Sequence, residues 1–277
     1  TEKIKVLFIP RWYPHRYDSM EGLFVQRQAE AILPWCEVAV IQVVVQDKCP
    51  EKPEALFSEE NGVRVLRIYR RGAGSTTLFS RMLSLWRYYR TGIQAVRSIR
   101  QFAPDIIHAH IMTRASIIGW RASVELKAPL VISEHWSRYL PQNHTYVGWL
   151  RRLVTNHVVS SAAALVPVSE ILKKALIDNG LNHCNMPVIP NVVNTAMFSL
   201  KPGALAGEKI TMIHLSCFDD RSKNISGFLR ALKAVSEKRN DFHCRMVGDG
   251  PDFYDMREYA GFLRIPPDLI TFTGQDE

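Results

Sequence analysis

Short apolar, β-branched segments alternate along this chain with longer segments whose hydrophobic residues recur at helical spacing. The alternation favours βαβ units and a mostly parallel sheet, with the most apolar strands covered on both faces. Up to residue 198 the pattern predicts strands at Ile4–Pro10, Val38–Val45, Val63–Tyr69, Asp105–His110, Leu130–His135 and Ala163–Ser169, with a short one near Val188. Helices are predicted at Gly22–Leu33, Thr77–Phe102, Ala115–Leu126, Thr145–Ser161 and Ser169–Asn179.

The pattern lapses at residues 199–209, where Pro, Gly and Lys predict a linker, and then starts again. The second cycle predicts strands at Ile210–Ser216, Phe242–Val247 and Leu269–Thr273, with helices at Asn224–Lys238 and Asp252–Leu263. We therefore expect one domain at 1–198 and a second at 210–277. The second is expected to be incomplete, because about 70 residues make only half of an ordinary domain.

Composition narrows the class of protein. The chain has 277 residues, of which 47% are hydrophobic and 22% charged, and this suffices for a large core. The net charge of +8 favours an anionic partner such as nucleotide phosphates, nucleic acid or acidic lipid. Scattered cysteines without CxxC spacing disfavour a disulfide framework and fit a reducing compartment. No apolar run has the length of a membrane span, so we expect a cytoplasmic protein, with attachment to the inner membrane face left open.

Two neighbouring predicted strands end on histidines. In PDIIHAH, His108 and His110 point to the same face, and His110 lies at the carboxyl end, where open α/β sheets bind ligands. We interpret His110 as functional and His108 as a buried structural histidine. LVISEHW brings Glu134 and His135 to the same edge; Glu134 is either a general base or a carboxylate that orients an imidazole. A metal site would need His135 as a third ligand, and no other feature indicates a metal.

Glycine-containing loops precede several helices. Gly22 lies just before the first helix, where a glycine lets a phosphate approach backbone N–H groups; a plain turn is the alternative. The GxGxxG fingerprint is absent, which counts against a dinucleotide cofactor. In VGDGP, Gly248 and Gly250 open a tight loop that is either a turn or a second close approach to a nucleotide.

Cationic residues precede the first helix of the second cycle. Asn224 is a predicted N-cap, and Lys223 lies beside it, where the helix dipole favours an anion. Arg221 is close by in the sequence. The alternative, which the sequence favours equally, is that Lys223 is an ordinary solvated surface lysine.

Residues 61–104 contain nine arginines and no acid. Their predicted helix, LFSRMLSLWRYYRTGIQAVRSIRQF, combines an apolar stripe with aromatic and basic residues, which suits an anionic membrane surface. The alternative is an ordinary crossover helix with a basic outer face. No known nucleic-acid-binding module is present.

Seven segments, in this order, resemble the retaining glycosyltransferases of family 4: GLFVQRQAE, PDIIHAH, PLVISEH, PVSEILKKALIDNG, VIPNVVNTAMF, SKNISGFLRAL and VGDGP. The resemblance covers nearly the whole chain and implies the GT-B fold, with two facing Rossmann-like domains. It further implies that a nucleotide-diphosphate sugar binds between the domains and that its sugar passes to a glycan or lipid-linked acceptor with retention. No cofactor or metal is implied, and the leaving phosphate takes the acceptor's proton.

The resemblance also implies roles for individual residues. Gly22 would lie by the diphosphate, and His110 would contact the transferred sugar near its anomeric centre. Lys223 would stabilise the departing phosphate, with Arg221 and Asn224 beside it.

Other roles follow from the same resemblance. The Gly248–Gly250 loop would border the nucleotide, and Glu134 and His135 would lie on the cleft wall. Asn191 would be structural.

The chain departs from the family pattern at two places. Cys217 or Phe218 stands where the family commonly has an arginine. The family's later pair of glutamates, eight residues apart, does not follow Glu208; Glu51 and Glu59 have that spacing but fall in a proline-containing loop of the first domain. The resemblance thus implies an incomplete site, and this chain alone need not turn over.

Two alternatives to a glycosyltransferase stay open. One is a nucleotide-sugar epimerase or hydrolase on the same fold, which would need carboxylates in the cleft. The other is a non-catalytic basic module that binds membrane or nucleic acid in a salt-sensitive way. The motif order favours the transferase, peripheral on the membrane that carries its acceptor.

Overall fold

The computed structural model describes residues 2–72, 77–143, 145–195, 198 and 210–274. The chain forms two compact units, Thr1–Thr195 and Ala196–Glu277, and each is described by itself. The predicted linker at 199–209, including Glu208, lies outside the described residues.

The first unit contains a seven-stranded sheet in the order β3-β4-β2-β1-β5-β6-β7. Every neighbouring pair is parallel except β3 and β4, so the predicted mostly parallel sheet is confirmed. The strands are β1 Ile4–Pro10, β2 Cys36–Gln46, β3 Glu54–Glu60, β4 Val63–Arg71, β5 Ile106–His110, β6 Leu130–Glu134 and β7 Ala164–Pro167.

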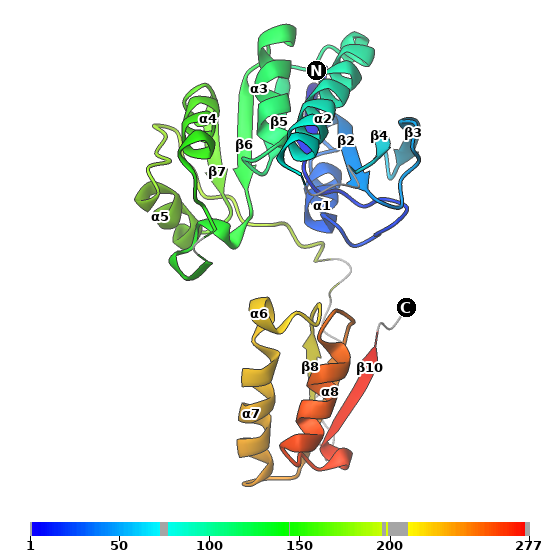
Figure 1. Cartoon of the computed structure of the whole chain (residues 1–277), viewed down its shortest axis with the longest axis vertical. Helices are drawn as coiled ribbons and strands as arrows, with labels where there is room; N and C mark the ends of the chain where they lie inside the picture. Colours follow the sequence, from blue (N-terminus) through cyan, green and yellow to red (C-terminus); the bar gives the residue numbers. More distant parts are fainter. Residues whose placement is uncertain (1, 73–76, 144, 196–197, 199–209, 275–277) are drawn as a thin grey trace. The chain divides into compact units, whose positions relative to one another are not determined.

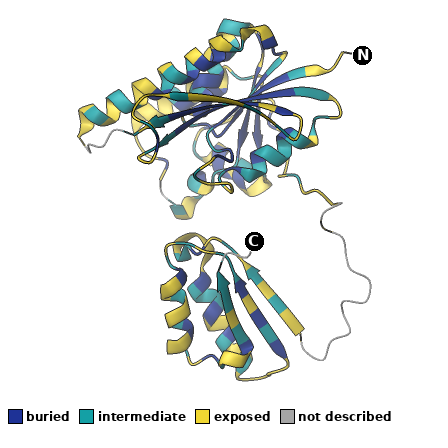
Figure 2. Cartoon of the chain, turned by 90° about the vertical axis from the view of Figure 1, so that its right-hand side faces the viewer, coloured by how far each residue is buried: buried dark blue, intermediate teal, exposed yellow. Residues whose placement is uncertain are grey.

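Helices cover both faces of this sheet (Figure 1). Val6 and Phe8 of β1 pack with α1, whereas Leu7 and Ile9 pack with α2 and α3 on the other face. Alternating side chains of one strand therefore enter two separate cores, which explains why β1 is apolar throughout. Figure 2 shows the buried residues gathered on these strands. The helices are α1 Leu23–Ala31, α2 Leu78–Ser98, α3 Ala115–Leu126, α4 Trp149–Ser160 and α5 Glu170–Asp178, with 3-10 turns at Arg100–Phe102, Ser137–Tyr139 and Pro141–Asn143.

Two expectations for the first unit are wrong. β3 occupies the segment expected to be a loop, so Glu59 lies on a strand, where it pairs with Arg64 of β4. Ion pairs of Glu54 with Arg16 and of Glu60 with Arg67 fix this strand. The segment near Val188 is not a strand, because prolines on either side of it lack the N–H that a ladder needs.

The second unit is a three-stranded parallel sheet in the order β10-β9-β8. Its predicted strands and helices are present, and the additional short helix α6 occupies a segment expected to be a loop. The elements are β8 Ile210–Leu215, α6 Asp220–Lys223, α7 Ile225–Ser236, β9 Phe242–Val247, α8 Phe253–Phe262, a 3-10 turn Pro267–Leu269 and β10 Ile270–Gly274. The core holds Phe218, Leu229 and Phe242, all nearly inaccessible.

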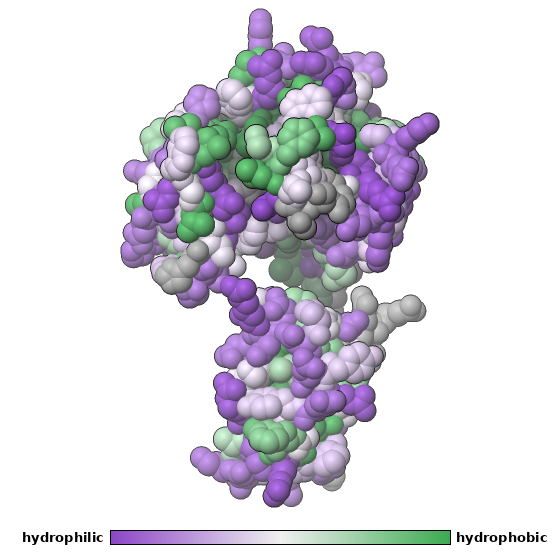
Figure 3. Space-filling view, in the orientation of Figure 1, coloured by the Kyte–Doolittle hydropathy of each residue, from purple (hydrophilic) through white to green (hydrophobic). Residues whose placement is uncertain are grey.

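The basic helix α2 has two different halves. Its second half packs on the sheet and on α3 through Tyr88, Gly92, Ala95 and Val96, as a crossover helix does. Its first half leaves large apolar side chains in solvent, among them Phe79 with an exposed fraction of 76%. Figure 3 shows hydrophobic side chains among hydrophilic ones on the face that carries α2 and α4. Among the described residues, no helix combines the length and the apolar character needed to cross a bilayer.

Candidate functional site

The end of β5 places two histidines on one face, as predicted. The rings of His108 and His110 lie 4.2 Å apart, and both contact Phe8 of the neighbouring strand. His108 Nε2 lies 2.8 Å from Ser133 Oγ, which supports its structural interpretation. His110 is completely buried.

A chain of hydrogen bonds leads from His110 to α1. His110 Nδ1 lies 3.2 Å from His135 Nε2, and His135 Nδ1 lies 3.0 Å from Asn191 Oδ1. Gln28 of α1 donates to the same Asn191 oxygen at 3.1 Å. Because an amide oxygen only accepts, the His135 proton resides on Nδ1, and His135 Nε2 accepts from the Nδ1–H of His110. Asn191 thereby sets the tautomer of both imidazoles.

The remaining nitrogen of His110 has no partner. Its Nε2 is buried and makes no hydrogen bond within the described part of the chain. With the proton on Nδ1, this nitrogen presents a lone pair, and leaving such a group unsatisfied costs about 1–3 kcal/mol. A hydroxyl group of a bound ligand would satisfy it. The arrangement therefore suits recognition of a hydroxyl-bearing molecule.

Burial disfavours the charged form of all three imidazoles. Burial, with a smaller contribution from the neighbouring histidines, holds the pKa of His110 well below its usual value. Burial also lowers the pKa of His108 to about 3 and that of His135 to about 4. His110 thus acts as a hydrogen-bonding group and not as a fixed cation.

Glu134 does not orient an imidazole in this structure, and its role as a general base stays a prediction. Its Oε2 accepts from the N–H of Met112 at 2.8 Å, and its Oε1 accepts from those of His135 and Trp136 at 2.9 and 2.7 Å. Burial raises the pKa of Glu134 to about 7, although these backbone bonds lower it. The carboxyl group contacts main chain and no imidazole, so it joins the loops that follow β5 and β6.

The loop after His110 is strained. Ile111 and Arg114 have positive φ angles of 79° and 65°, which are unusual for residues other than glycine, above all for a β-branched one. Hydrogen bonds from Ile111 N to Ser133 O and from Ser116 Oγ to Ile111 O hold the loop, both at 2.8 Å. Such strain is typical of functional sites.

Gly22 has a structural reason to be glycine. It precedes α1 with a φ angle of 68°, and a Cβ there would lie 2.2 Å from the carbonyl carbon of Trp12. A side chain at this position would collide with the loop's own backbone. The contact with a phosphate that the family resemblance implies stays a prediction.

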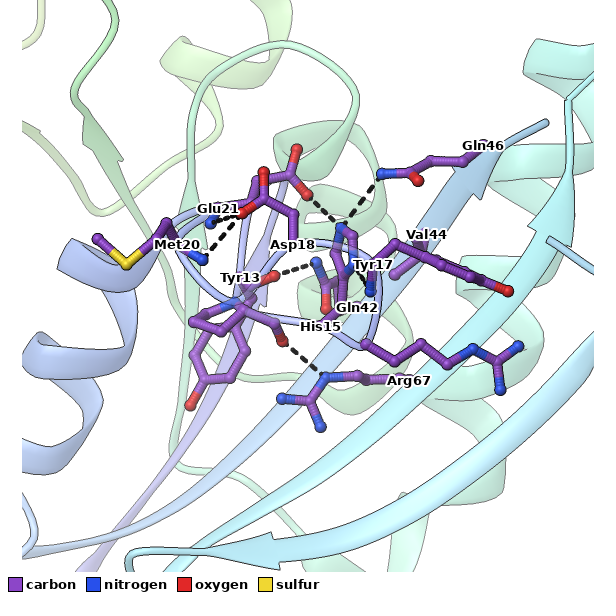
Figure 4. A network of polar contacts seen from close by, with 12 residues as sticks. Tyr13, His15, Tyr17, Asp18, Met20, Glu21, Gln42, Val44, Gln46 and Arg67 are labelled. Atoms are coloured by element: carbon purple, nitrogen blue, oxygen red, sulfur yellow. Dashed lines mark hydrogen bonds and ion pairs between the residues drawn. The ribbon is translucent and has the colours of Figure 1, made fainter. Parts of the chain in front are cut away.

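A polar network fixes the loop that leads to Gly22 (Figure 4). His15 lies with its Nε2 2.6 Å from Glu21 Oε2, and Asp18 Oδ1 accepts from the N–H groups of Met20 and Glu21. From the sheet, Gln42 Nε2 donates to Tyr13 O at 2.7 Å. These bonds anchor the start of α1.

Helix α1 connects this loop to the histidines. Its Phe24 ring lies 4.5 Å from the His135 ring, and its Gln28 reaches Asn191. The first unit therefore brings Gly22, His110 and His135 into one neighbourhood. From the sequence, Asn191 is expected to be structural and Gln28 has no expected role, because the two residues lie 163 positions apart and no local pattern joins them.

In the second unit the predicted cationic residues lie at the carboxyl end of β8. Arg221 and Lys223 belong to α6 and are exposed. Asn224 occupies the N-cap position of α7 with a φ angle of 52°, but its side chain makes no cap bond. The expected cap is instead provided by Asp220, whose Oδ1 accepts from Ser226 N at 2.7 Å. The left-handed backbone at Asn224 turns its own side chain out of capping geometry.

The two predicted glycines of this unit allow loops to pack backbone against backbone. A Cβ on Gly248 would lie 2.0 Å from Ser216 O, and one on Gly250 would lie 2.6 Å from Phe218 N. Phe218 N donates to Asp249 O at 2.9 Å, so these loops meet at one edge of the sheet. Their contact with a nucleotide stays a prediction.

Cys217 and Phe218, the two candidates for the position of the family's arginine, differ in burial. Phe218 has an exposed fraction of 0% and belongs to the core, whereas Cys217 is exposed. Cys217 is therefore the position of the two that can face a ligand. Within the described residues, no group of three His, Cys, Asp or Glu side chains is placed to hold a metal ion.

The two α/β units have the GT-B fold class that the solved structures of similar fold share. Residues 27–197, more than half of the chain, match the family model of Glycosyltransferase Family 4, so the chain belongs to this family.

Known proteins of similar sequence and fold agree with this assignment. The chain is 26% identical over 204 residues to an alpha-monoglucosyldiacylglycerol synthase of Streptococcus pneumoniae; the match spans 67% of this chain and 45% of that protein. The structure of a sucrose-phosphate synthase from Thermosynechococcus elongatus is similar to this chain, with a TM-score of 0.64 and 16% sequence identity. The match covers 100% of this chain and 71% of the synthase chain. The structure of a lipopolysaccharide outer core galactosyltransferase, WaaB, has a TM-score of 0.55 and 14% sequence identity. This match covers 99% of this chain and 69% of the WaaB chain. At these identities the solved structures show the fold alone.

Proposed function

We propose that the protein transfers a sugar from a nucleotide-diphosphate sugar to a lipid-linked or polysaccharide acceptor, with retention at the anomeric carbon. The observation that carries the proposal is the unpartnered, buried Nε2 of His110. It lies at the carboxyl end of a parallel strand, where open α/β sheets bind their ligands. A sugar supplies the hydroxyl group that this nitrogen lacks.

His110 is proposed to orient the donor sugar. Its neutral Nε2 accepts a hydrogen bond from a sugar hydroxyl, while His135 and Asn191 hold the ring in the required tautomer. A site built around such a bond discriminates strongly against analogues that lack the hydroxyl, by about 10⁴-fold or more. Orientation of the donor is the main contribution of these groups.

Charge stabilisation is assigned to groups of the second unit. Cleavage of the sugar–phosphate bond leaves negative charge on the diphosphate oxygens. Lys223 and Arg221 lie just before α7, whose N-terminus favours anions. Fixed cations and helix dipoles stabilise such charge without reorganising during the reaction. In the first unit, the loop at Gly22 before α1 is proposed to offer backbone N–H groups to a phosphate.

A lipid-linked acceptor is supported by two observations. The name of the pneumococcal relative describes synthesis of a glucosylated diacylglycerol. In this chain, α2 and α4 expose large apolar side chains, including Phe79 and Trp149 with exposed fractions of 76% and 77%, close to arginines in the sequence. Such a surface suits peripheral attachment to an anionic membrane.

A thermal-shift panel of nucleotide sugars on the complete protein, followed by turnover with the best binder, tests this function. Saturation at 100 times Kd adds about 2.7 kcal/mol of stability, so we expect the cognate donor to raise Tm by about 5 °C. Turnover should release the nucleotide diphosphate and retain the anomeric configuration. Absence of both a shift and turnover across uridine, guanosine and adenosine diphosphate sugars would refute the proposal.

A further inference from the structure

A pocket of about 610 Å³ lies in the first unit, bounded by α2, α3, α4 and the loops that follow β1, β5 and β6. Its lining contains no acidic residue. It does contain five arginines, Arg11, Arg81, Arg114, Arg138 and Arg151. The family resemblance assigned none of them a role.

The positive charge of this pocket is not neutralised. None of its five arginines forms an ion pair with another described residue. Arg11 donates to Thr113 Oγ1 at 2.8 Å and Arg151 to Thr145 O at 3.1 Å, so both bond neutral groups. The Nε of Arg138 is buried and has no hydrogen-bond partner in the described part of the chain. Arg11 and Arg138 are half-buried, whereas Arg81, Arg114 and Arg151 are exposed, so the pocket presents positive charge that an anionic ligand could neutralise.

Trp136 holds two of these arginines in place. The guanidinium carbon of Arg138 lies 3.8 Å from the Trp136 ring centroid, and that of Arg11 lies 4.6 Å from it. Stacking on an indole fixes the planar fork of each arginine. Burial lowers the pKa of both groups, and neighbouring arginines lower it further, which is the signature of cations that repel one another.

Glu134, the carboxyl group that acts electrostatically on Arg11 and Arg138, does not compensate them. Both of its oxygens are occupied by backbone N–H groups, and burial raises its pKa to about 7. The pocket thus keeps an excess of positive charge at neutral pH. Guanidinium groups in such a cluster match the geometry of phosphate oxygens, which they bind bidentately.

The pocket lining also includes apolar side chains. They come from α2, α3 and α4 and include Leu85, Ile117, Leu150 and Val154. Outside the pocket the same helices continue this character, with the exposed residues Phe79, Met82, Trp149 and Leu153. One ligand with a phosphorylated head and a hydrocarbon chain would match both the arginines and the apolar side chains.

We propose that this pocket binds the phosphate or diphosphate head of a lipid-linked acceptor, with its chain along the apolar sides of α2 and α4. The inference rests on the proposed function, since it names the acceptor of that reaction. The position fits, because Arg11 N donates to His110 O at 3.2 Å and the loop from Met112 to Arg114 lines the pocket. The acceptor proposed here is charged and so differs from the neutral diacylglycerol in the name of the pneumococcal relative, because a neutral lipid would leave the arginines without a counter-charge.

Calorimetric titration of the complete protein with farnesyl diphosphate, pyrophosphate and farnesol tests the proposal, with no nucleotide sugar present. We expect farnesyl diphosphate to bind at least 10-fold more tightly than either pyrophosphate or farnesol. Arg11→Gln and Arg138→Gln should each weaken it at least 10-fold. Arg87→Gln, on the same helix as Arg81 but outside the pocket, is the matched control and should change binding less than 2-fold.

Each other outcome overturns the proposal. Equal affinity for pyrophosphate would indicate a site for free phosphate, and equal affinity for farnesol a site for neutral lipid. Equal losses in Arg87→Gln and Arg138→Gln would indicate general surface attraction. If Arg138→Gln fails to fold, Arg81→Gln, which changes an exposed residue of the pocket, must show the loss instead. The proposed function fails separately, through lack of response to nucleotide sugars, and that result leaves this titration unaffected.

Discussion

Replacing His110 with alanine in the complete protein should lower kcat/KM for sugar transfer by about 10³-fold, or about 4 kcal/mol of transition-state stabilisation. The reason is that Nε2 of His110 is the buried acceptor at the strand end and has no other partner among the described residues. Steady-state transfer assays with the cognate nucleotide sugar measure the effect.

The matched control for His110 is its neighbour His108. His108→Gln keeps an amide within reach of Ser133 and removes only the second imidazole. We expect its kcat/KM to stay within about 3-fold of the unchanged protein. If His110→Ala retains full turnover, or if both variants lose activity equally, His110 does not have the proposed role. Thermal melting shows whether each variant is folded.

Lys223→Ala should lower kcat by about 10²–10³-fold, the loss typical of removing one group that stabilises developing charge. Lys223 is exposed at the end of α6, directly before α7, so its removal leaves no cavity and should change Tm little. The measurement is single-turnover transfer at saturating donor. This separates the chemical step from donor binding.

Lys238→Ala provides the control for net charge. Lys238 is also exposed, but it follows the carboxyl end of α7, at the other end of the same helix. Loss of one positive charge there should leave kcat unchanged. Equal effects of the two substitutions would mean that Lys223 acts only through the overall charge of the protein.

Much of the fold could be predicted because the apolar segments are strong signals. The bounds of β1, α3 and β9 agree with those expected from the pattern. β3 could not be foreseen, because its residues are largely polar and its stability comes from pairing with β4 and from ion pairs with Arg16 and Arg67. Tertiary pairing overrides weak local propensity in such a strand.

The candidate site could be predicted only in part. Strand alternation alone places His108 and His110 on one face. The partners that set their tautomers come from β6, α1 and the segment before residue 195, and nothing local connects them. Residue type alone did not predict the contacts of Glu134. A glutamate beside a histidine suggests acid–base chemistry, but the carboxylate of Glu134 accepts hydrogen bonds from backbone N–H groups.

The loop glycines also show what a sequence pattern can and cannot predict. Gly22, Gly248 and Gly250 each lie in a loop where a phosphate could approach. In all three the space of a Cβ is already filled by the protein's own backbone. A glycine in the sequence therefore indicates a close approach without saying which molecule approaches.

The central claim is that His110 presents an unprotonated Nε2 to the donor sugar. Nitrogen-15 NMR of the histidine side chains, assigned with His110→Gln, tests it most directly. Because burial disfavours the charged imidazolium, we predict a neutral Nδ1–H tautomer for His110 throughout pH 6–8 and a shift of its Nε2 signal when the nucleotide sugar binds. An imidazolium or an Nε2–H tautomer in this range, or an Nε2 signal that the bound donor leaves unmoved, would contradict the account.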